Sequence, residues 1–437
     1  MFEVNFDGII GPTHNYGGLS EGNIASISNS QNPANPKKAA LQGLKKMKIL
    51  RDAGLIQGVF LPHERPYLAK MREMGFTGSD KQIINKVASH SPHLLHNLYS
   101  ASSMWSANAA TVSPSVDTAD KKIHITPANL NAMFHRSIES DFTYHQCLQI
   151  FKNESFKIHK PVPPISGYGD EGAANHLRVA SNHEQKGFEI FIFGTSAFKA
   201  YNSSIMRQAK EISHTVALKH QLNTEHYFLL QQNQDAIQQG SFHNDIVSLS
   251  NENIFIAHEK AFEDRNALNQ IIRILENNVS NFQFIEIKEN EIPLTDIIKS
   301  YLLNSQLVST TDGEMLMVLP ADVQNFDNCM QWIDKLKQIS PVKKFEFVDI
   351  KQSMMNGGGP ACLRLKVLMN NKELEGLNKN FILDDNKIEQ IKHLIQSFYR
   401  DRILPDDLKD PDLLDEFQMI LDQYTQIFDL ENFYSFQ

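Results

Sequence analysis

Short apolar segments alternate along this chain with amphipathic helical stretches. The predicted strands include residues 58–61, 123–125, 188–193, 253–257, 315–319 and 345–350. Helices are predicted at about residues 259–276 and 327–338, between some of these strands. This alternation predicts an α/β fold. The pattern alone fits a doubly wound sheet equally well, and the sequence shows no clean internal repeat.

Two further helical patterns lie towards the ends of the chain. Asn35 is suited to cap a helix, Pro36 to occupy its first turn and Gly54 to end it. The buried face of this helix is predicted to consist of Leu41, Leu44, Met47 and Leu50. Apolar residues at helical spacing also predict two amphipathic helices within about residues 386–428. We expect these C-terminal helices to pack on the main body of the protein or on a partner subunit.

The composition argues against several classes of protein. The 437 residues are 41% hydrophobic and can bury a large core, and no long linker divides them. A net charge of −9 without a basic stripe argues against nucleic-acid binding. The chain has no run of 18 apolar residues, and its first residues lack the charged and apolar regions of a secretory signal. We therefore expect a cytoplasmic protein with no nucleic-acid or membrane partner.

The three cysteines, Cys147, Cys329 and Cys362, are widely spaced and include no CxxC pair. This arrangement predicts reduced thiols, with neither a disulfide framework nor a zinc site. We expect no metal and no cofactor, because the chemistry described below needs only a thiol, an imidazole and carboxylates.

Cys362 follows three consecutive glycines, Gly357 to Gly359, which let another chain or a ligand come close. Residues 361–367 then alternate as a strand does, so Cys362 and Arg364 are predicted to share one face. A cation on that side would lower the pKa of the thiol, and the thiolate is the nucleophilic form. The alternative is a buried, inert cysteine beside a structural turn, since free cysteine is among the most buried residue types.

Two more stretches carry candidate chemistry. Residues 242–247 have strand character, which predicts that His243 and Asp245 share one face and offer a proton carrier and an anion. Residues 167–176 combine acids, including Glu171, with small residues, as expected in a close-fitting polar site. The alternatives are a hydrogen-bonded structural histidine and an ordinary acidic turn.

Together these stretches resemble the N-succinylarginine dihydrolase family of the pentein, or guanidino-group-modifying, superfamily. The resemblance covers nearly the whole chain, and no motif position on which it depends is substituted. The matching segments are residues 3–8, 18–20, 62–66, 106–111, 134–136, 356–364 and 399–402. The resemblance implies an α/β fold that is a five-bladed pseudosymmetric α/β propeller, with the active site in its central channel. It also implies a single catalytic domain over residues 1–437, with the C-terminal helices packed on it, and a homodimer.

A guanidinium group is planar and effectively always protonated, so it must be held before its carbon can be attacked. Glu171 and Asp245 are suited to accept its N–H donors in fork geometry. Cys362 is then the expected nucleophile, assisted by a cationic histidine or by the charge of the substrate. His243 can protonate the departing ammonia and then activate water, because its ordinary pKa is about 6.5.

The resemblance further implies a set of substrate contacts. It assigns Glu171 to the catalytic residues with Cys362 and His243. The contacts are Gly17, Gly18, Leu19, Ser20, Glu21, Gly22, Asn23, Ile24, Ala25, Ser26, Asn108, His135, Arg136, Arg207, Asp245 and Asn356. Arg136 and Arg207 are the natural forks for the carboxylates of a succinylated amino acid.

The expected reaction of this family converts N-succinylarginine to N-succinylornithine, two ammonia and carbon dioxide. The resemblance, rather than any residue pattern, implies that the ureido product stays bound and reacts again. Three alternatives stay open at this point. A cysteine peptidase uses the same residue types, a binding protein would hold the zwitterion without turnover, and an arginine deiminase or amidinotransferase is the nearest relative in chemistry.

Overall fold

The computed structural model describes residues 1–198 and 207–437. Its strands form five separate sheets of three strands each. In chain order within the ring, the sheets are β3 (Ala110–Ser113), β4 (Ile123–Pro127) and β5 (Phe156–Ile158); β6 (His176–Val179), β7 (Phe188–Phe193) and β8 (Tyr227–Gln231); β9 (Ser248–Asn251), β10 (Ile254–His258) and β11 (Gln283–Ile287); β12 (Gln306–Ser309), β13 (Met315–Pro320) and β14 (Val342–Val348); and β15 (Arg364–Met369), β1 (Phe2–Gly8) and β2 (Ile56–Phe60).

All five sheets have the same topology. In each, the first strand runs antiparallel to the middle strand, and the third strand runs parallel to the middle strand. Parallel neighbours need a crossover connection, and each module supplies a helix for it. These helices are α2 (Pro36–Asp52), α7 (Ser140–Ile150), α8 (Lys210–Lys219), α10 (Arg265–Asn278) and α12 (Asp327–Ile339). The fold is therefore a five-module α/β propeller, and the doubly wound alternative is wrong.

The ring is closed by its two ends. The last strand, β15, pairs with the first, β1, so that Phe2 lies opposite Met369 and Asp7 opposite Arg364. Residues of the first strand of every module line one axial cavity, whose volume is about 890 Å³ when its open mouth is included. We therefore call the first strand of each module its inner strand. The inner strands β6 and β9, β9 and β12, and β15 and β3 lie against one another around the cavity.

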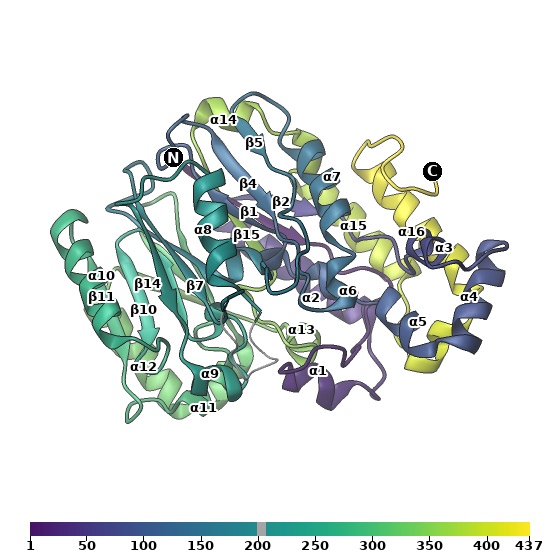
Figure 1. Cartoon of the computed structure of the whole chain (residues 1–437), viewed down its shortest axis with the longest axis horizontal. Helices are drawn as coiled ribbons and strands as arrows, with labels where there is room; N and C mark the ends of the chain where they lie inside the picture. The colour runs from purple at the N-terminus through teal and green to yellow at the C-terminus, as the bar shows by residue number, and fades with distance from the viewer. Residues whose placement is uncertain (199–206) are drawn as a thin grey trace.

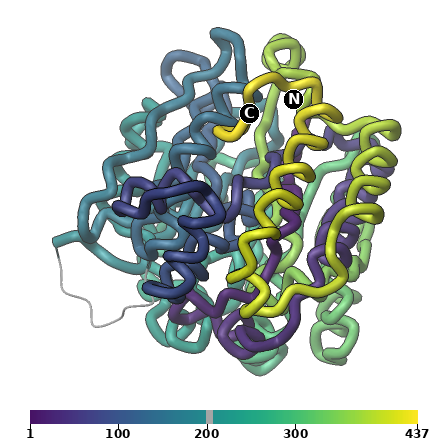
Figure 2. The backbone as a smooth tube through the Cα atoms, turned by 90° about the vertical axis from the view of Figure 1, so that its right-hand side faces the viewer, coloured from purple at the N-terminus to yellow at the C-terminus, as the bar shows by residue number. Residues whose placement is uncertain are grey.

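The C-terminal helices cover the module that closes the ring. Helix α15 (Asp385–Phe398) runs beside α2, and α16 (Leu413–Ile427) runs beside α15 (Figure 2). Ile391 and Tyr424 from these helices share one hydrophobic core with Val4 and Phe6 of β1. The C-terminal segment therefore packs on the first and last strands of the ring.

The connection from β2 to β3 forms a helical lobe beside the C-terminal helices (Figure 1). It contains α3 (Leu68–Glu73), α4 (Asp80–His90) and α5 (Pro92–Leu98), whose apolar faces pack against Leu414 and Phe417 of α16. The remaining short helices are α1 (Ile24–Asn29), α6 (Phe134–Ser137), α9 (Gln234–Gln238), α11 (Leu294–Ser300), α13 (Lys351–Met355) and α14 (Asn371–Glu375).

The predicted helix after Asn35 is confirmed, and the Asn35 side chain caps it by accepting from the Lys38 backbone. Two predicted strands differ from the structure. The segment 242–247 is not a strand, because residues 244–246 form a tight 3₁₀ turn, η4 (Asn244–Ile246), before β9 begins. The strand predicted from residue 361 begins only at residue 364, so Cys362 lies in the turn that precedes β15.

Candidate active site

The candidate catalytic groups lie on the segments that lead into the inner strands. Asn108, Asn304 and Cys362 each lie two residues before the inner strand of their module, and Glu171 and His243 each lie five residues before theirs. Because the modules share one topology, the segments that lead into the inner strands meet near the axis of the ring. Residues far apart in sequence are thereby gathered into one site.

A closed ring of hydrogen bonds ties these five segments together. Each segment is bonded to the next by at least one backbone group. The bonds run from Ala107 N–H to the Cys362 carbonyl (3.1 Å), from Asn108 Nδ2 to the Glu171 carbonyl (2.7 Å), from Asn244 N–H to Asn175 Oδ1 (2.9 Å), from Asn304 Nδ2 to the Asp245 carbonyl (3.2 Å) and from Ala361 N–H to the Asn304 carbonyl (3.1 Å). The site is therefore held by backbone geometry from every module.

Three glycines shape the turn that carries Cys362. A Cβ atom on Gly357 would lie 2.2 Å from Asn23 Oδ1, one on Gly358 would lie 2.3 Å from the Trp105 ring, and one on Gly359 would lie 2.6 Å from Asn304 Oδ1. Gly357 also has a φ of +105°, which side chains disfavour. The close approach predicted for the glycine run is confirmed.

The thiol of Cys362 is buried, with 6% of the residue exposed. Its Sγ donates to Asp245 Oδ2 at 3.3 Å and accepts from Asn304 Nδ2 at 3.2 Å. Burial, reinforced by the Asp245 carboxylate, raises the pKa of this thiol well above its usual value. The prediction that Arg364 lowers the thiol pKa is wrong, because the Arg364 guanidinium instead faces Glu3 at 3.5 Å.

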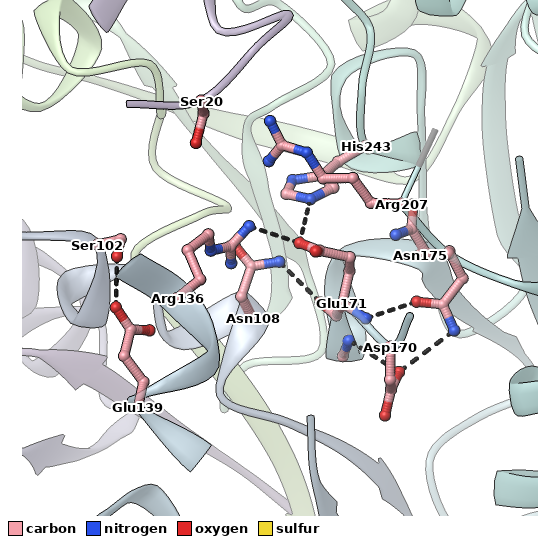
Figure 3. Close-up of polar contacts among 12 residues, drawn as sticks. Ser20, Ser102, Asn108, Arg136, Glu139, Asp170, Glu171, Asn175, Arg207 and His243 are labelled. Atoms are coloured by element: carbon pink, nitrogen blue, oxygen red, sulfur yellow. Dashed lines mark hydrogen bonds and ion pairs between the residues drawn. The ribbon is translucent and has the colours of Figure 1, made fainter. Parts of the chain in front are cut away.

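Glu171 is fully buried and shared between two donors. Its Oε2 accepts from Arg136 Nη1 at 2.5 Å and from His243 Nε2 at 2.8 Å, as Figure 3 shows. Burial raises the pKa of Glu171, but the Arg136 charge and the His243 hydrogen bond outweigh it, so the net pKa is lowered and the group is a carboxylate.

Burial lowers the pKa of His243 to about 4, although its bond to Glu171 acts in the opposite direction. The imidazole is therefore neutral at pH 7 rather than near half-protonation. Because the Glu171 carboxylate can only accept, the ring proton belongs on Nε2, which leaves Nδ1 as a base. His243 is therefore not a cation that could assist the thiol.

Burial raises the pKa of Asp245 to about 7. Its side chain borders the axial cavity and reaches the sulfur of Cys362 from that side. One oxygen of each predicted guanidinium acceptor, Glu171 Oε1 and Asp245 Oδ1, is buried and has no hydrogen-bond partner among the residues that the structure describes. Unpaired buried acceptors are costly, so these two oxygens indicate a missing donor.

A pocket of about 520 Å³, including its open mouth, leads to Cys362. Thirteen of the predicted site residues lie in its wall. These are Gly17, Gly18, Leu19, Ser20, Asn23, Ser26, Asn108, His135, Arg136, Arg207, His243, Asn356 and Cys362. Glu171 and Asp245 lie behind this wall, and Glu21, Gly22, Ile24 and Ala25 of the predicted loop are not part of it.

The loop that contains Ser20 and Ser26 is tied to the rest of the pocket by side chains. Ser20 Oγ lies 3.2 Å from His135 Nε2, and Ser26 Oγ donates to Asn356 Oδ1 at 3.0 Å. Burial, with the nearby Arg136 and Arg207 charges, lowers the pKa of His135 to about 3, so this ring is also neutral. The loop therefore presents neutral polar groups to the pocket.

The two arginines add the positive charge of the pocket. The Arg207 guanidinium lies 4.7 Å from the centre of the Phe242 ring, and its Nη2 donates to the Glu21 carbonyl at 3.0 Å. Burial lowers the pKa of Arg207 to about 10, which leaves it charged at pH 7. Arg136 Nε and Nη2 and Arg207 Nε are buried without acceptors among the described residues. Unsatisfied donors thus lie in the pocket wall, and the two unsatisfied acceptors lie behind it.

Sequence reasoning missed several residues of the pocket and its surroundings. They are Asn15, Ser100, Ala101, Ser102, Trp105, Phe242 and Asn304. Phe242 is the first residue of the candidate segment 242–247, and Trp105 directly precedes the matching segment 106–111, so their position in the sequence is a usable signal. Asn304 stands between Leu303 and Ser305 in a segment without any motif. Only the fold brings it to Cys362.

No helix in the part of the chain that the structure describes is long and apolar enough to cross a membrane. Within residues 1–198 and 207–437, no group of three or more histidine, cysteine, aspartate or glutamate side chains is arranged to hold a metal ion.

Solved structures define the class of the fold. The apo structure of ArgZ, an arginine dihydrolase from the ornithine-ammonia cycle in cyanobacteria, is 13% identical with a TM-score of 0.52, and the match covers 84% of this chain and 41% of that one. The product-bound N-terminal domain of ArgZ gives a TM-score of 0.50 at 13% identity, over 84% of this chain and 98% of that one. These likenesses show a protein of the pentein fold.

Sequence relatives define the family. The sequence model of the family described as succinylarginine dihydrolase matches residues 1–437. N-succinylarginine dihydrolases of Pseudoalteromonas translucida and Idiomarina loihiensis are 46% and 43% identical, over 100% of this chain and 98% and 99% of theirs. The chain belongs to the succinylarginine dihydrolase family.

Proposed function

We propose that this chain is a hydrolase that converts N2-succinyl-L-arginine and two waters to N2-succinyl-L-ornithine, two ammonia and carbon dioxide. This reaction belongs to arginine catabolism through succinylated intermediates. The observation that carries the proposal is the charge pattern of unsatisfied buried atoms, with acceptors at Glu171 and Asp245 beside the thiol and donors at Arg136 and Arg207. Membership of the family over the full chain supports the choice of substrate.

The two carboxylates are suited to hold the guanidinium of the substrate. Glu171 Oε1 and Asp245 Oδ1 each need a donor, and a guanidinium presents N–H groups in a rigid plane. Asp245 already contacts the sulfur of Cys362 through its other oxygen. A guanidinium nitrogen bound at Asp245 would therefore bring the central carbon close to the nucleophile, which is the main contribution of positioning to catalysis.

The two arginines are suited to hold the carboxylates of the succinyl group and the amino acid. Arg136 uses Nη1 for Glu171, so its Nε and Nη2 stay available for the substrate. Arg207 is oriented by its stacking on Phe242. In this arrangement Arg136 links the two ends of the substrate, because it also fixes the carboxylate that holds the guanidinium.

The first round of the reaction forms a covalent amidino intermediate. The Cys362 sulfur bonds to the guanidinium carbon, one C–N bond breaks, and the thiol proton leaves with that nitrogen as ammonia. The positive charge of the bound substrate offsets the burial that disfavours the thiolate. His243, neutral before the reaction, can accept the thiol proton and deliver it to the departing nitrogen.

Water then replaces the sulfur. His243 accepts a proton from the attacking water, the C–S bond breaks, and the thiol is restored as the ureido product forms. A second round of the same steps releases the second ammonia and leaves a carbamate on the side-chain nitrogen. Loss of carbon dioxide from this carbamate gives the amine of N-succinylornithine.

The partners of Cys362 differ from those in a cysteine peptidase. In such an enzyme the histidine is hydrogen-bonded to the nucleophile. Here the described partners of the Cys362 sulfur are Asp245 and Asn304, whereas His243 is bonded to Glu171. A planar cation between the carboxylates fits this arrangement better than a peptide bond does.

The test is the number of ammonia molecules released per N-succinylarginine consumed by the purified protein, with free arginine as a control. We expect two, with arginine inert. One ammonia would indicate a deiminase that stops at the ureido product. Release of none, with retained binding of N-succinylarginine, would indicate a binding protein and overturn the proposal.

We also propose that residues 1–437 form a single catalytic domain, that the chain acts in the cytoplasm and that it assembles as a homodimer. All three proposals rest on the family, and the free state of Cys147, Cys329 and Cys362 supports a reducing compartment. Light scattering of the purified protein tests the assembly, because a dimer has twice the 49.7 kDa mass of the chain. A single mass of 49.7 kDa at working concentrations would contradict the dimer.

A further inference from the structure

We propose that Asn304 is a further catalytic residue, whose side-chain amide donates a hydrogen bond to the Cys362 sulfur and stabilises it as the thiolate. The inference deepens the proposed function, on which its catalytic meaning rests. Asn304 belongs to a different module from Cys362 and occupies the equivalent position, two residues before the inner strand β12. Its side chain is completely buried and contacts the reacting atom directly, with Nδ2 3.2 Å from Sγ.

The orientation of the Asn304 amide is fixed by two backbone groups. The Gly359 N–H can only donate, and it lies 2.9 Å from Oδ1. The Asp245 carbonyl can only accept, and it lies 3.2 Å from Nδ2. If the amide were flipped, its oxygen would face the Asp245 carbonyl, another acceptor, and its NH₂ group would face the Gly359 N–H, another donor. The sulfur therefore faces an N–H donor and not an oxygen.

The backbone reinforces this placement. The Asn304 carbonyl accepts from the Ala361 N–H at 3.1 Å, so Asn304 is bonded to two backbone N–H groups, those of Gly359 and Ala361, in the segment that leads to Cys362. Gly359 is required for this contact, because a Cβ atom there would lie 2.6 Å from Asn304 Oδ1. The third glycine of the run thus has a specific function, which is to admit the asparagine.

The other titratable neighbours of the sulfur offer it no direct cation. Asp245 from η4 is an acid, and Tyr301, just after α11, is buried with its pKa raised. The ammonium of Lys46 from α2 is paired with Asp7 at 2.5 Å. Arg364 is directed towards Glu3. Among the described side chains, Asn304 is the donor placed to stabilise negative charge on Sγ.

The experiment compares Asn304→Asp and Asn304→Ala with the unmodified protein. Aspartate keeps the shape and can still accept from the Gly359 N–H, but it places an anion where the donor stood. The matched control is Asn378→Asp, because Asn378 likewise accepts from a backbone N–H and donates to a backbone carbonyl, outside the site. Melting temperatures identify any variant that fails to fold.

The first measurement is the rate constant for alkylation of Cys362 by iodoacetamide between pH 7 and 10, followed by mass spectrometry of its peptide. We expect Asn304→Asp to lower the rate about 10- to 100-fold at each pH, the range for loss of a charge-assisted hydrogen bond. Asn304→Ala should lower it less, and Asn378→Asp should leave it unchanged. A folded Asn304→Asp variant with unchanged alkylation would overturn the proposal.

The second measurement is kcat and KM for N-succinylarginine. We expect Asn304→Asp to lower kcat by a similar factor with less effect on KM. A loss of kcat without any loss of alkylation would indicate a merely structural role and contradict the inference. If the unmodified protein releases no ammonia while the alkylation rates differ as expected, the proposed function fails and the contact between Asn304 and the sulfur stands.

Discussion

Replacing Glu171 with glutamine removes one buried charge from the centre of the site while keeping its shape. The carboxylate accepts from Arg136 and His243 through one oxygen, and its other oxygen is the proposed guanidinium acceptor. Removing one partner of a buried ion pair costs about 3–5 kcal/mol. If that loss falls on the transition state, kcat/KM falls roughly a hundred- to a few thousandfold, since 1.36 kcal/mol is a factor of ten.

The assay is kcat/KM for Glu171→Gln from initial rates of ammonia release, with Glu189→Gln as the control. Glu189 is also buried and accepts from a histidine, His176 at 3.0 Å, but it lies outside the pocket. Both variants should lose stability, whereas only Glu171→Gln should lose activity per folded molecule. Retention of more than a tenth of the activity by Glu171→Gln, or an equal loss in Glu189→Gln, would refute the reasoning.

Three other predictions follow from the site. Cys362→Ser should abolish turnover, while calorimetry should show that N-succinylarginine still binds. Cys147→Ser and Cys329→Ser should remain active, because both thiols are buried away from the pocket. An inactive but folded Cys329→Ser variant would contradict the choice of nucleophile. Chelators should leave the rate of ammonia release unchanged, and a loss restored by zinc would contradict metal-free chemistry. Below about pH 7, kcat/KM should fall up to tenfold per pH unit, because the raised pKa of Asp245 means that its carboxyl group becomes protonated and neutral as the pH falls. The pH profile of Asp245→Asn should lack this decrease at low pH. An unchanged decrease in that variant would exclude Asp245 as its source.

Most helices and strands and the motif residues can be predicted from the sequence, but their arrangement in space cannot. The helix capped by Asn35 and the strands β4, β7 and β13 follow from local pattern, because capping and alternation are local properties. The fivefold repeat could not be predicted from self-similarity, since the modules share topology and connections without sharing residues. The position two residues before the inner strand, for example, is an asparagine in two modules, a cysteine in one and neither in the other two.

The errors near the site have a common physical cause. The segments that carry His243 and Cys362 do alternate as strands do, yet both form turns just before an inner strand. A short offset of this kind reverses which side chains share a face. The alternating pattern predicts Arg364 beside Cys362, whereas in the structure Arg364 belongs to β15, opposite Asp7 of β1, and its guanidinium lies 3.5 Å from Glu3.

The protonation states of the site residues also cannot be predicted from the neighbouring sequence. Burial holds His243 neutral and keeps Cys362 protonated, and burial depends on all five modules. Two buried acids, Glu171 and Asp245, have pKa values shifted in opposite directions, because only Glu171 is paired with an arginine. Such a divergence is typical of groups with distinct catalytic functions.

The closure of the ring connects the fold to the chemistry. Cys362 lies just before β15, and the partner of β15 is β1 at the other end of the chain. The hydrogen bonds around the axis pass through Cys362, Asn304, Asn244 and Asn108 and return to Cys362. The nucleophile is therefore in position only when the longest-range strand pairing has formed. Every module contributes a bond to that ring, so the catalytic geometry is a property of the closed propeller and not of any one motif.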